Sequence, residues 1–317
     1  MPSSHPDQPP HDPHDPQCTP RPPEPERAAE WRRAFAVEAR SERPDLARLC
    51  LLVAAQADGA LDEAGIDAAQ VELDRLAGEL PFRPGGSHAW ARALAGLLGG
   101  RYDFRGTPGD YRRLDSSLLH TVLRRRRGLP ILLSVVWIEV ARRAGAPVYG
   151  VALPGHFVVG IGPYGERAAE AGAEHAASGA ELSGQVLVDP FHGGRVLTDV
   201  DTQRIVAGAA GTPLEASMLR PADPLDVVVR ILNNIRAWAA ARPEHSDVAL
   251  WAVELMLQLP SHPARLRQER AELLVQRGEY LAGAAEFEAY AKVVGAVDRG
   301  AADVLLRRAR AARAMLN

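Results

Sequence analysis

The chain has 317 residues, which exceeds one typical domain and predicts two folded units with additional tails. Hydrophobic residues make up 46% of the sequence, enough to bury a sizeable core. The formal net charge of −3 gives no reason to expect a polyanionic partner, so the composition argues against nucleic-acid binding.

The cysteines and the lengths of the apolar runs indicate in which cellular compartment the protein is expected. Cys18 lies in a proline-rich segment and Cys50 in an apolar helical pattern, which is not the pattern of a disulfide framework. The first residues are proline-rich and polar, unlike a secretory signal peptide. There is no run of 18 apolar residues, so no membrane span is predicted. We therefore expect a soluble, cytoplasmic protein.

The N-terminal part divides into a tail and a helical region. Residues 1–26 are mainly Pro, His, Asp and Gln, which predicts a disordered tail. His11 and His14 could bind a metal only loosely, because the neighbouring prolines keep them extended. Across residues 27–98, apolar side chains recur at helical spacing and predict several helices packed through leucines and aromatic residues.

A loop rich in glycine and proline follows over residues 101–109. The helical spacing of apolar side chains from Asp110 to Arg127 predicts one further helix, which ends in the four arginines 124–127. These arginines could grip phosphate, but they also complement the negative end of the helix dipole.

The stretch from Gly128 to Gly162 predicts the centre of the fold. Pro130 suits a first helical position, and the nearly continuous apolar run after it indicates a buried helix that ends at Gly145. Two short β-branched runs then predict buried strands. The strands are expected over Val148–Leu153 and Phe157–Ile161, joined by the turn Pro154-Gly155, with His156 directly after the turn.

The sequence after this stretch predicts an exposed loop, two strands and then helices only. The loop covers residues 163–184, the strands Gln185–Val188 and Arg195–Leu197, and a short helix Asp199–Val206. The later helices are expected over Val227–Ala240, Val248–Leu259, Pro263–Arg277, Glu279–Val294 and Ala301–Leu316. Helices of this length with short hinges favour an αα-hairpin array, and GEYLAGAAEFEAY resembles part of a tetratricopeptide unit. One good unit and one weak one do not predict a full solenoid.

Three motifs in the order RRGLPILLSV, LPGHFVV and DPFHGG resemble the SirB-type branch of the transglutaminase-like superfamily, over residues 45–317. The resemblance implies a papain-like core. In that core a cysteine at the start of a buried helix attacks an acyl group, a histidine activates it and an aspartate orients the histidine. Carried over by position, His156 matches the histidine and Asp189 the aspartate, but the cysteine position falls on Pro130.

The chain departs from the family pattern elsewhere too. An Asn-Ser-x-Leu-Asn motif is replaced within residues 115–120, and Leu132 stands where that branch usually has a small hydroxyl residue. Ser134 is the nearest substitute nucleophile, about one helical turn and ~6 Å beyond Pro130. Its apolar neighbours favour the alternative of a buried hydroxyl bonded to a carbonyl one turn back.

Several roles remain open for His156 and Asp189. They could form a structural hydrogen bond that sets the imidazole tautomer, or they could recognise a ligand or catalyse without the cysteine. A metal site with His192 is a further alternative, although the spacing is not that of a known cage. An enzyme needs His156 in an open cleft, whereas a structural pair should be covered by Phe157, Phe191 and Trp137.

We expect an α+β fold that is mainly helical, with a papain/transglutaminase-like core, a small antiparallel sheet and a helical tetratricopeptide-like region. The expected divisions are a tail over residues 1–26, the core with its N-terminal helices over 27–222 and the helical region over 223–317.

The predicted function is that of a non-catalytic protein that binds a protein or ligand, with a protein partner on the C-terminal helices. The alternative is a hydrolase or acyltransferase that uses the His156–Asp189 dyad. A third possibility is regulatory, with the tail and the helical repeat recruiting partners. No cofactor, metal, nucleic acid or membrane is expected as a ligand.

Overall fold

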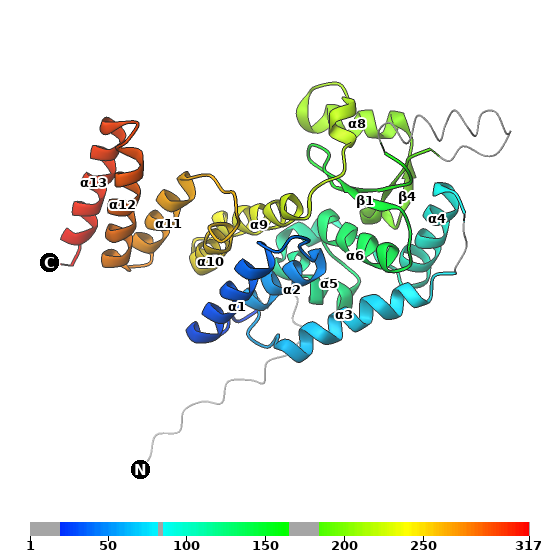
Figure 1. Cartoon of the computed structure of the whole chain (residues 1–317), viewed down its shortest axis with the longest axis horizontal. Coiled ribbons are helices and arrows are strands. Elements are labelled where there is room, and N and C mark those ends of the chain that lie inside the picture. Colours follow the sequence, from blue (N-terminus) through cyan, green and yellow to red (C-terminus); the bar gives the residue numbers. More distant parts are fainter. Residues whose placement is uncertain (1–19, 82–84, 165–183, 317) are drawn as a thin grey trace, which may run out of the picture.

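The computed structural model describes residues 20–81, 85–164 and 184–316, and it is mainly helical with one small sheet (Figure 1). This confirms the predicted fold class. The predicted tail lies outside the described residues as far as residue 19, and Pro25 and Glu26 already form the first turn of helix α1. Most of the predicted loop 163–184 also lies outside the described residues.

Two of the N-terminal helices begin where an aspartate caps the first turn. Asp45 accepts a hydrogen bond from the backbone N–H of Arg48 at 2.8 Å, and Asp62 does the same for Gly65 at 2.8 Å. Each bond satisfies a donor that the first helical turn leaves without a partner. The elements are α1 (Pro25–Glu38), α2 (Leu46–Ala57), α3 (Glu63–Gly78), α4 (Ser87–Leu94) and the π-helical segment η1 (Ala95–Arg101).

The single helix predicted from Asp110 to Arg127 is wrong. The structure has two 3₁₀ turns, η2 (Pro108–Arg112) and η3 (Leu114–Ser117), and then the short helix α5 (Leu119–Arg125). The Asp110 carboxylate accepts bonds from the Thr107 N–H and from the Ser116 hydroxyl, at 2.8 and 2.9 Å. Such local side-chain bonds compete with a continuous helix.

Helix α6 (Pro130–Arg143) is buried along nearly its whole length and lies against the sheet. The strands form an antiparallel meander in sequence order. They are β1 (Val148–Val151), β2 (Val158–Ile161), β3 (Val186–Asp189) and β4 (Arg195–Leu197).

Side chains alternate between the two faces of the sheet, as the period of a strand requires. Phe157 and Val159 belong to the main hydrophobic cluster with α6, whereas Val158 and Leu197 pack with Val206 of α8 (Asp199–Ala210). Figure 1 shows the sheet between α6 and α8. Both faces of the sheet are therefore covered.

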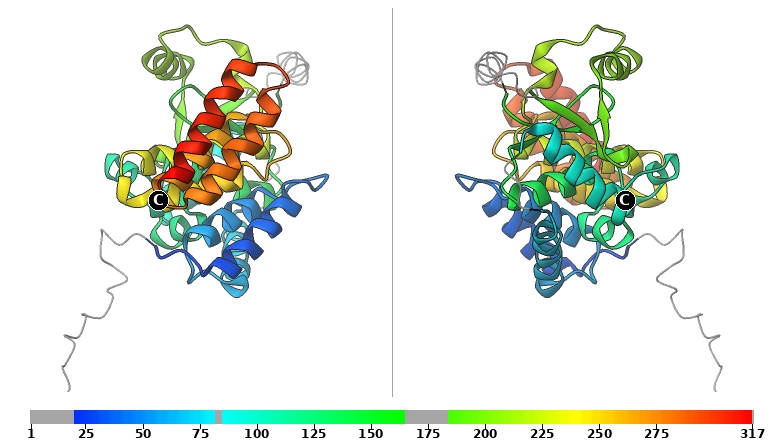
Figure 2. Two further views of the ribbon diagram at one scale, coloured as in Figure 1. Left: turned by 90° about the vertical axis from the view of Figure 1, so that its left-hand side faces the viewer. Right: turned by 90° about the vertical axis from the view of Figure 1, so that its right-hand side faces the viewer.

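The C-terminal helices extend from this body, and the last of them carry a small hydrophobic cluster of their own (Figures 1 and 2). They are α9 (Pro224–Ala240), the 3₁₀ turn η6 (Pro243–His245), α10 (Ser246–Met256), α11 (Arg265–Gln276), α12 (Tyr280–Val294) and α13 (Arg299–Ala314). The main hydrophobic cluster continues through α9 and α10 to Leu266, while the second cluster begins at Ala271. Within the described residues, no helix combines the length and apolar character needed to cross a bilayer.

Candidate functional site

The histidine of the LPGHFVV motif lies in the loop between β1 and β2. Gly155 has a φ of +70°, a conformation that glycine adopts readily, and it turns the chain so that the backbone N–H of His156 donates to the Leu153 carbonyl at 3.2 Å. Arg230 of α9 holds this loop from outside by donating to the carbonyl oxygens of Leu153 and His156, at 3.0 and 2.8 Å. The loop that carries the imidazole is thus held by a hydrogen bond within the turn and by hydrogen bonds from Arg230.

The aspartate is the last residue of β3 and is almost fully buried. Strand β3 pairs with β2 in a register that places Val188 opposite Val159. Asp189 and His156 consequently emerge at the same end of two neighbouring strands. Oδ1 of Asp189 accepts a hydrogen bond from the Phe191 backbone N–H at 3.0 Å, which orients the carboxylate.

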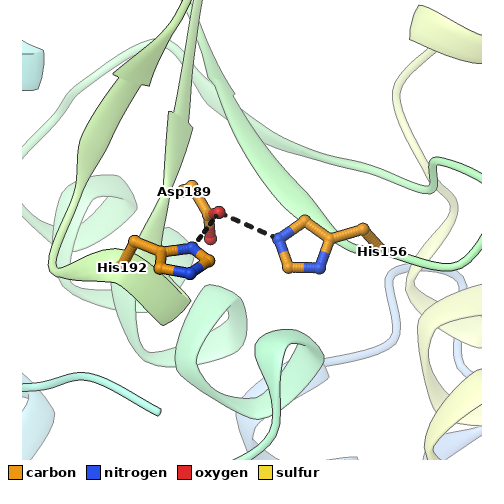
Figure 3. Close-up of side chains that lie close together, drawn as sticks. All are labelled: His156, Asp189 and His192. Atoms are coloured by element: carbon orange, nitrogen blue, oxygen red, sulfur yellow. Dashed lines mark hydrogen bonds and ion pairs between the residues drawn. The ribbon is translucent and has the colours of Figure 1, made fainter. Parts of the chain in front are cut away.

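Oδ2 of the Asp189 carboxylate faces two histidines (Figure 3). His192 donates its Nδ1–H to Oδ2 at 2.7 Å. Nε2 of His156 lies 3.0 Å from the same oxygen, but its N–H direction misses it, so this nitrogen makes no aligned hydrogen bond. The His156 contact is therefore mainly electrostatic.

The accessibility of the two histidines differs strongly. The His156 side chain is 13% exposed, and the Phe191 ring meets it edge to face with 6.3 Å between ring centroids. The His192 side chain is 62% exposed. Trp137 and Phe157 are fully buried nearby in the core. The site is mostly covered on the His156 side and open on the His192 side.

Two residues from distant segments complete the surroundings of the pair. Tyr111 of η2 packs edge to face on Phe191 with 6.1 Å between centroids, and burial together with the negative charge of Asp189 raises its pKa. Burial also lowers the pKa of Arg230. Sequence reasoning missed both residues, because neither lies within a motif and only the fold brings Tyr111 to Phe191 and Arg230 to the His156 loop.

The three polar residues could in principle hold a metal ion. His156, Asp189 and His192 each offer a ligand atom, and these atoms lie within 4.8 Å of one another. Two histidines and one carboxylate are a common donor set for transition metals. The 2.7 Å separation of Nδ1 and Oδ2 is, however, that of a direct hydrogen bond, so the arrangement is already satisfied on the His192 side.

The two candidate nucleophile positions lie on α6. Pro130 is the first residue of this helix, as predicted, and it is buried. Ser134 is fully buried, and its hydroxyl donates to the Phe157 carbonyl at 3.3 Å. The expected bond to a carbonyl one turn back is therefore replaced by a bond across to the strand segment.

Comparison with known proteins places these features in a family. A sequence model described as the transglutaminase-like superfamily matches residues 67–233, more than half of the chain. A tetratricopeptide-repeat model matches residues 235–317.

Curated relatives match part of the chain. A UPF0162 protein of Xylella fastidiosa is 32% identical over 169 residues, covering 52% of this chain and 54% of the relative. A UPF0162 protein of Pseudomonas aeruginosa is 31% identical over 131 residues, 41% of either chain. The F-box only protein 21 of Mus musculus is 25% identical over 175 residues, 55% of this chain and 26% of the relative. The chain thus spans about half the length, or less, of these relatives.

Proposed function

The chain belongs to the transglutaminase-like superfamily, and from this premise we propose that it acts by binding a protein or a ligand rather than by covalent catalysis. The observation that carries the proposal is Pro130 at the start of α6, the position of the nucleophilic cysteine in the superfamily pattern. A proline offers neither a thiol nor a hydroxyl. Three ordered motifs support the narrower assignment to the SirB-type branch, and a cytoplasmic location stays a prediction.

Two other candidate nucleophiles in the described residues also support a non-covalent role. Ser134 is fully buried, and its hydroxyl is used by the Phe157 carbonyl. Cys50 is buried in α2, and burial raises the pKa of its thiol, which keeps it in the unreactive protonated form. Neither group combines solvent access with an adjacent base, which nucleophilic catalysis requires.

We assign His156 and Asp189 to structure and ligand recognition. Asp189 is oriented by the Phe191 N–H, and His156 is largely covered by the Phe191 ring. Because the His156 ring is covered, a structural pair that stabilises the loop is favoured, and a catalytic pair in an open cleft is not. The exposed ring of His192 then offers a polar contact for a ligand at the same place.

The C-terminal helices are the proposed protein-binding surface. Proteins with tetratricopeptide repeats commonly bind partners through stacked helical hairpins, and α11–α13 are the part that carries its own hydrophobic cluster. Its helices expose apolar side chains, among them Leu281 and Val304 at 57% and 41%. In this scheme residues 27–222 carry the core site and residues 223–317 recruit the partner.

One observation favours the alternative of a hydrolase or acyltransferase. Asp189 faces His156 at 3.0 Å from a neighbouring strand and is itself held by a backbone N–H, the arrangement of a catalytic dyad. Such an enzyme would need water or a substrate group as its nucleophile.

Turnover measurements separate the two functions. The full chain and the His156→Gln variant are compared for hydrolysis of ester, thioester and amide substrates. We expect both proteins to show the same background rates, because no nucleophilic side chain within the described part of the chain is hydrogen-bonded to the His156 imidazole. Hydrolysis by the natural chain that disappears in His156→Gln would establish the enzyme instead.

Site-specific photocross-linking tests the binding surface. A photoreactive residue at Leu281 of α12 is compared with one at Val71 of α3, since these side chains have similar exposures of 57% and 64%. We expect a defined protein adduct from position 281 that is absent from position 71. Equal adduct patterns at both positions would contradict a binding role for the C-terminal helices.

A further inference from the structure

A second polar hollow lies away from the His156 site, where the two matched regions of the chain meet. Its volume is about 780 Å³, a size typical of small-molecule sites. One wall comes from η2, η3 and α5, and the other from the end of α9 and η6. The described residues that line it do not include His156, Asp189 or His192.

The charges around this hollow are predominantly positive. Five arginines line it, namely Arg112, Arg113, Arg125, Arg127 and Arg242. Three carboxylates accompany them, from Asp110, Asp115 and Glu244. The hollow therefore carries an excess of two positive charges in a chain whose net charge is −3. Such a local excess attracts anions.

The buried carboxylates hold arginines in place. Asp115 accepts a bidentate pair of bonds from Arg113, at 3.0 and 2.7 Å, and a third from Arg125 at 2.7 Å. The Asp110 side chain is 4% exposed and is saturated by the Thr107 and Ser116 donors. These acids therefore position the guanidinium groups and are themselves largely withdrawn from the hollow.

Among the described residues, Arg112 and Arg242 are the lining arginines without a carboxylate partner, since Arg127 pairs with Asp103 at 2.7 Å. Within the residues that the structure describes, neither side chain pairs with a carboxylate. Arg242 donates to the carbonyl oxygens of Trp238 and Arg112, at 2.8 and 3.4 Å, and its guanidinium lies 4.5 Å from the Trp238 ring centroid. The indole N–H of Trp238 also donates to the Arg112 carbonyl at 2.9 Å. The Arg242 guanidinium is thus held against the Arg112 backbone before any ligand binds.

We propose that this hollow is a binding site for a small dianion with a phosphate or two carboxylate groups. The planar guanidinium fork matches the oxygen spacing of both groups, and two excess positive charges match a dianion. Arg125 and Arg127 belong to the arginine run 124–127, so the fold gives part of that run a role beyond the helix dipole. The proposal uses none of the residues that carry the proposed function.

Isothermal titration calorimetry on the full chain at low ionic strength tests the site. The probes are inorganic phosphate, phenyl phosphate and succinate, with chloride as the monovalent reference. We expect saturable binding of at least one dianion. The probe with the higher affinity shows whether the site prefers a phosphate or a dicarboxylate. Arg112→Gln and Arg242→Gln should each weaken binding about tenfold or more, because each removes a hydrogen bond to a charged group.

Arg124→Gln is the matched control. It removes the same charge from an exposed arginine of the same run, but Arg124 does not line the hollow, so its dianion affinity should stay within about twofold of the natural chain. Circular dichroism confirms the fold of each variant, and if Arg242→Gln unfolds, Arg112→Gln alone decides the result. The absence of saturable binding below about 10 mM, or equal losses in Arg124→Gln and Arg112→Gln, would overturn the proposal.

Discussion

Asp189 is a buried carboxylate whose charge depends on the two histidines that face it. Burial raises the pKa of Asp189, but the contact with His156 and its charge, and then those of His192, outweigh it, so the pKa lies below its ordinary value of 3.8. The carboxylate is consequently ionised at neutral pH. Because its other oxygen bonds to the Phe191 N–H, the charge also fixes the turn after β3.

Replacing Asp189 by Asn should lower the free energy of unfolding by about 1–3 kcal/mol near neutral pH. The folded pKa is depressed, so the stabilisation is fully present above the unfolded value and is lost as the pH falls through the folded pKa. The difference between the natural chain and Asp189→Asn should therefore shrink below pH 3.8. Urea denaturation across this pH range measures it.

Asp67→Asn serves as the control, since Asp67 is an exposed carboxylate on α3. It should leave the free energy of unfolding nearly unchanged at every pH. A loss in Asp189→Asn that persists undiminished at acidic pH would show that the carboxylate charge is not what stabilises the turn.

At this scale the sequence could place some site residues but not others. His156 and Asp189 belong to motifs at the ends of two predicted strands, and the order of the short apolar runs predicts that these strands are neighbours. The role of the two residues stays a prediction. Tyr111 and Arg230 could not be found, because each reaches the site by packing from a separate segment. His192 was visible in DPFHGG, but its hydrogen bond to Asp189 depends on the 3₁₀ turn η4 (Pro190–His192).

The turn that follows β3 is the element that joins the site to the core. Gly193 and Gly194 have φ values of +67° and +83°, and the Gly194 N–H donates to the Asp189 carbonyl at 2.8 Å. A Cβ atom on Gly194 would lie only 2.1 Å from the Trp137 ring of α6. Only glycine fits between the turn and the indole, so the turn and α6 determine each other's position.

Gly194→Ala should destabilise the fold by about 2–5 kcal/mol, because it combines left-handed strain with overpacking against Trp137. Gly145→Ala isolates the strain, since Gly145 has almost the same φ of +82° with nothing within 4 Å of its Cβ position. We expect Gly145→Ala to cost only about 1–2 kcal/mol. Thermal denaturation of both variants gives the comparison, and equal losses would mean that contact with Trp137 is unimportant.

The sequence predicts a helix correctly where apolar spacing and end signals agree, and fails where local polar side chains interrupt the helix. The helix predicted from Pro130 agrees with α6, because its start, its apolar filling and its glycine stop all point the same way. Residues 110–127 show the same helical spacing, yet Asp110 bonds to Thr107 and Ser116 and divides the segment into short turns. Apolar spacing alone does not reveal such local polar competition.

In the whole molecule, the hydrophobic core does not separate where the sequence composition changes. Helix α9 contacts α2, α6 and η3, and Val228 and Ile235 belong to the main cluster. Among the described residues after Pro224, the part from Ala271 onward forms a separate cluster. The composition changes at Pro224 because helices replace strands, but the burial of α9 is set by its packing partners in the N-terminal region.

Two truncations test this division. Removing the residues after 262 should leave a cooperatively folding protein, because most of the lost apolar contacts lie within α11–α13. Removing those after 222 should abolish cooperative unfolding, since it uncovers apolar surface on α2 and α6. Calorimetry distinguishes the outcomes, and a cooperative transition in the shorter chain would place the structural boundary at residue 222 instead.

Binding without a covalent nucleophile is most directly tested by intact-mass spectrometry after exposure to iodoacetamide, a vinyl sulfone and a fluorophosphonate. The experiment uses the Cys18→Ser chain, so that Cys50 is the remaining thiol. The native protein should gain no mass, because Pro130 has no nucleophile, Ser134 is buried and burial raises the pKa of Cys50. The unfolded protein should gain one iodoacetamide adduct at Cys50. An adduct on the native chain that is lost in His156→Gln would contradict the binding function and reveal an activated nucleophile.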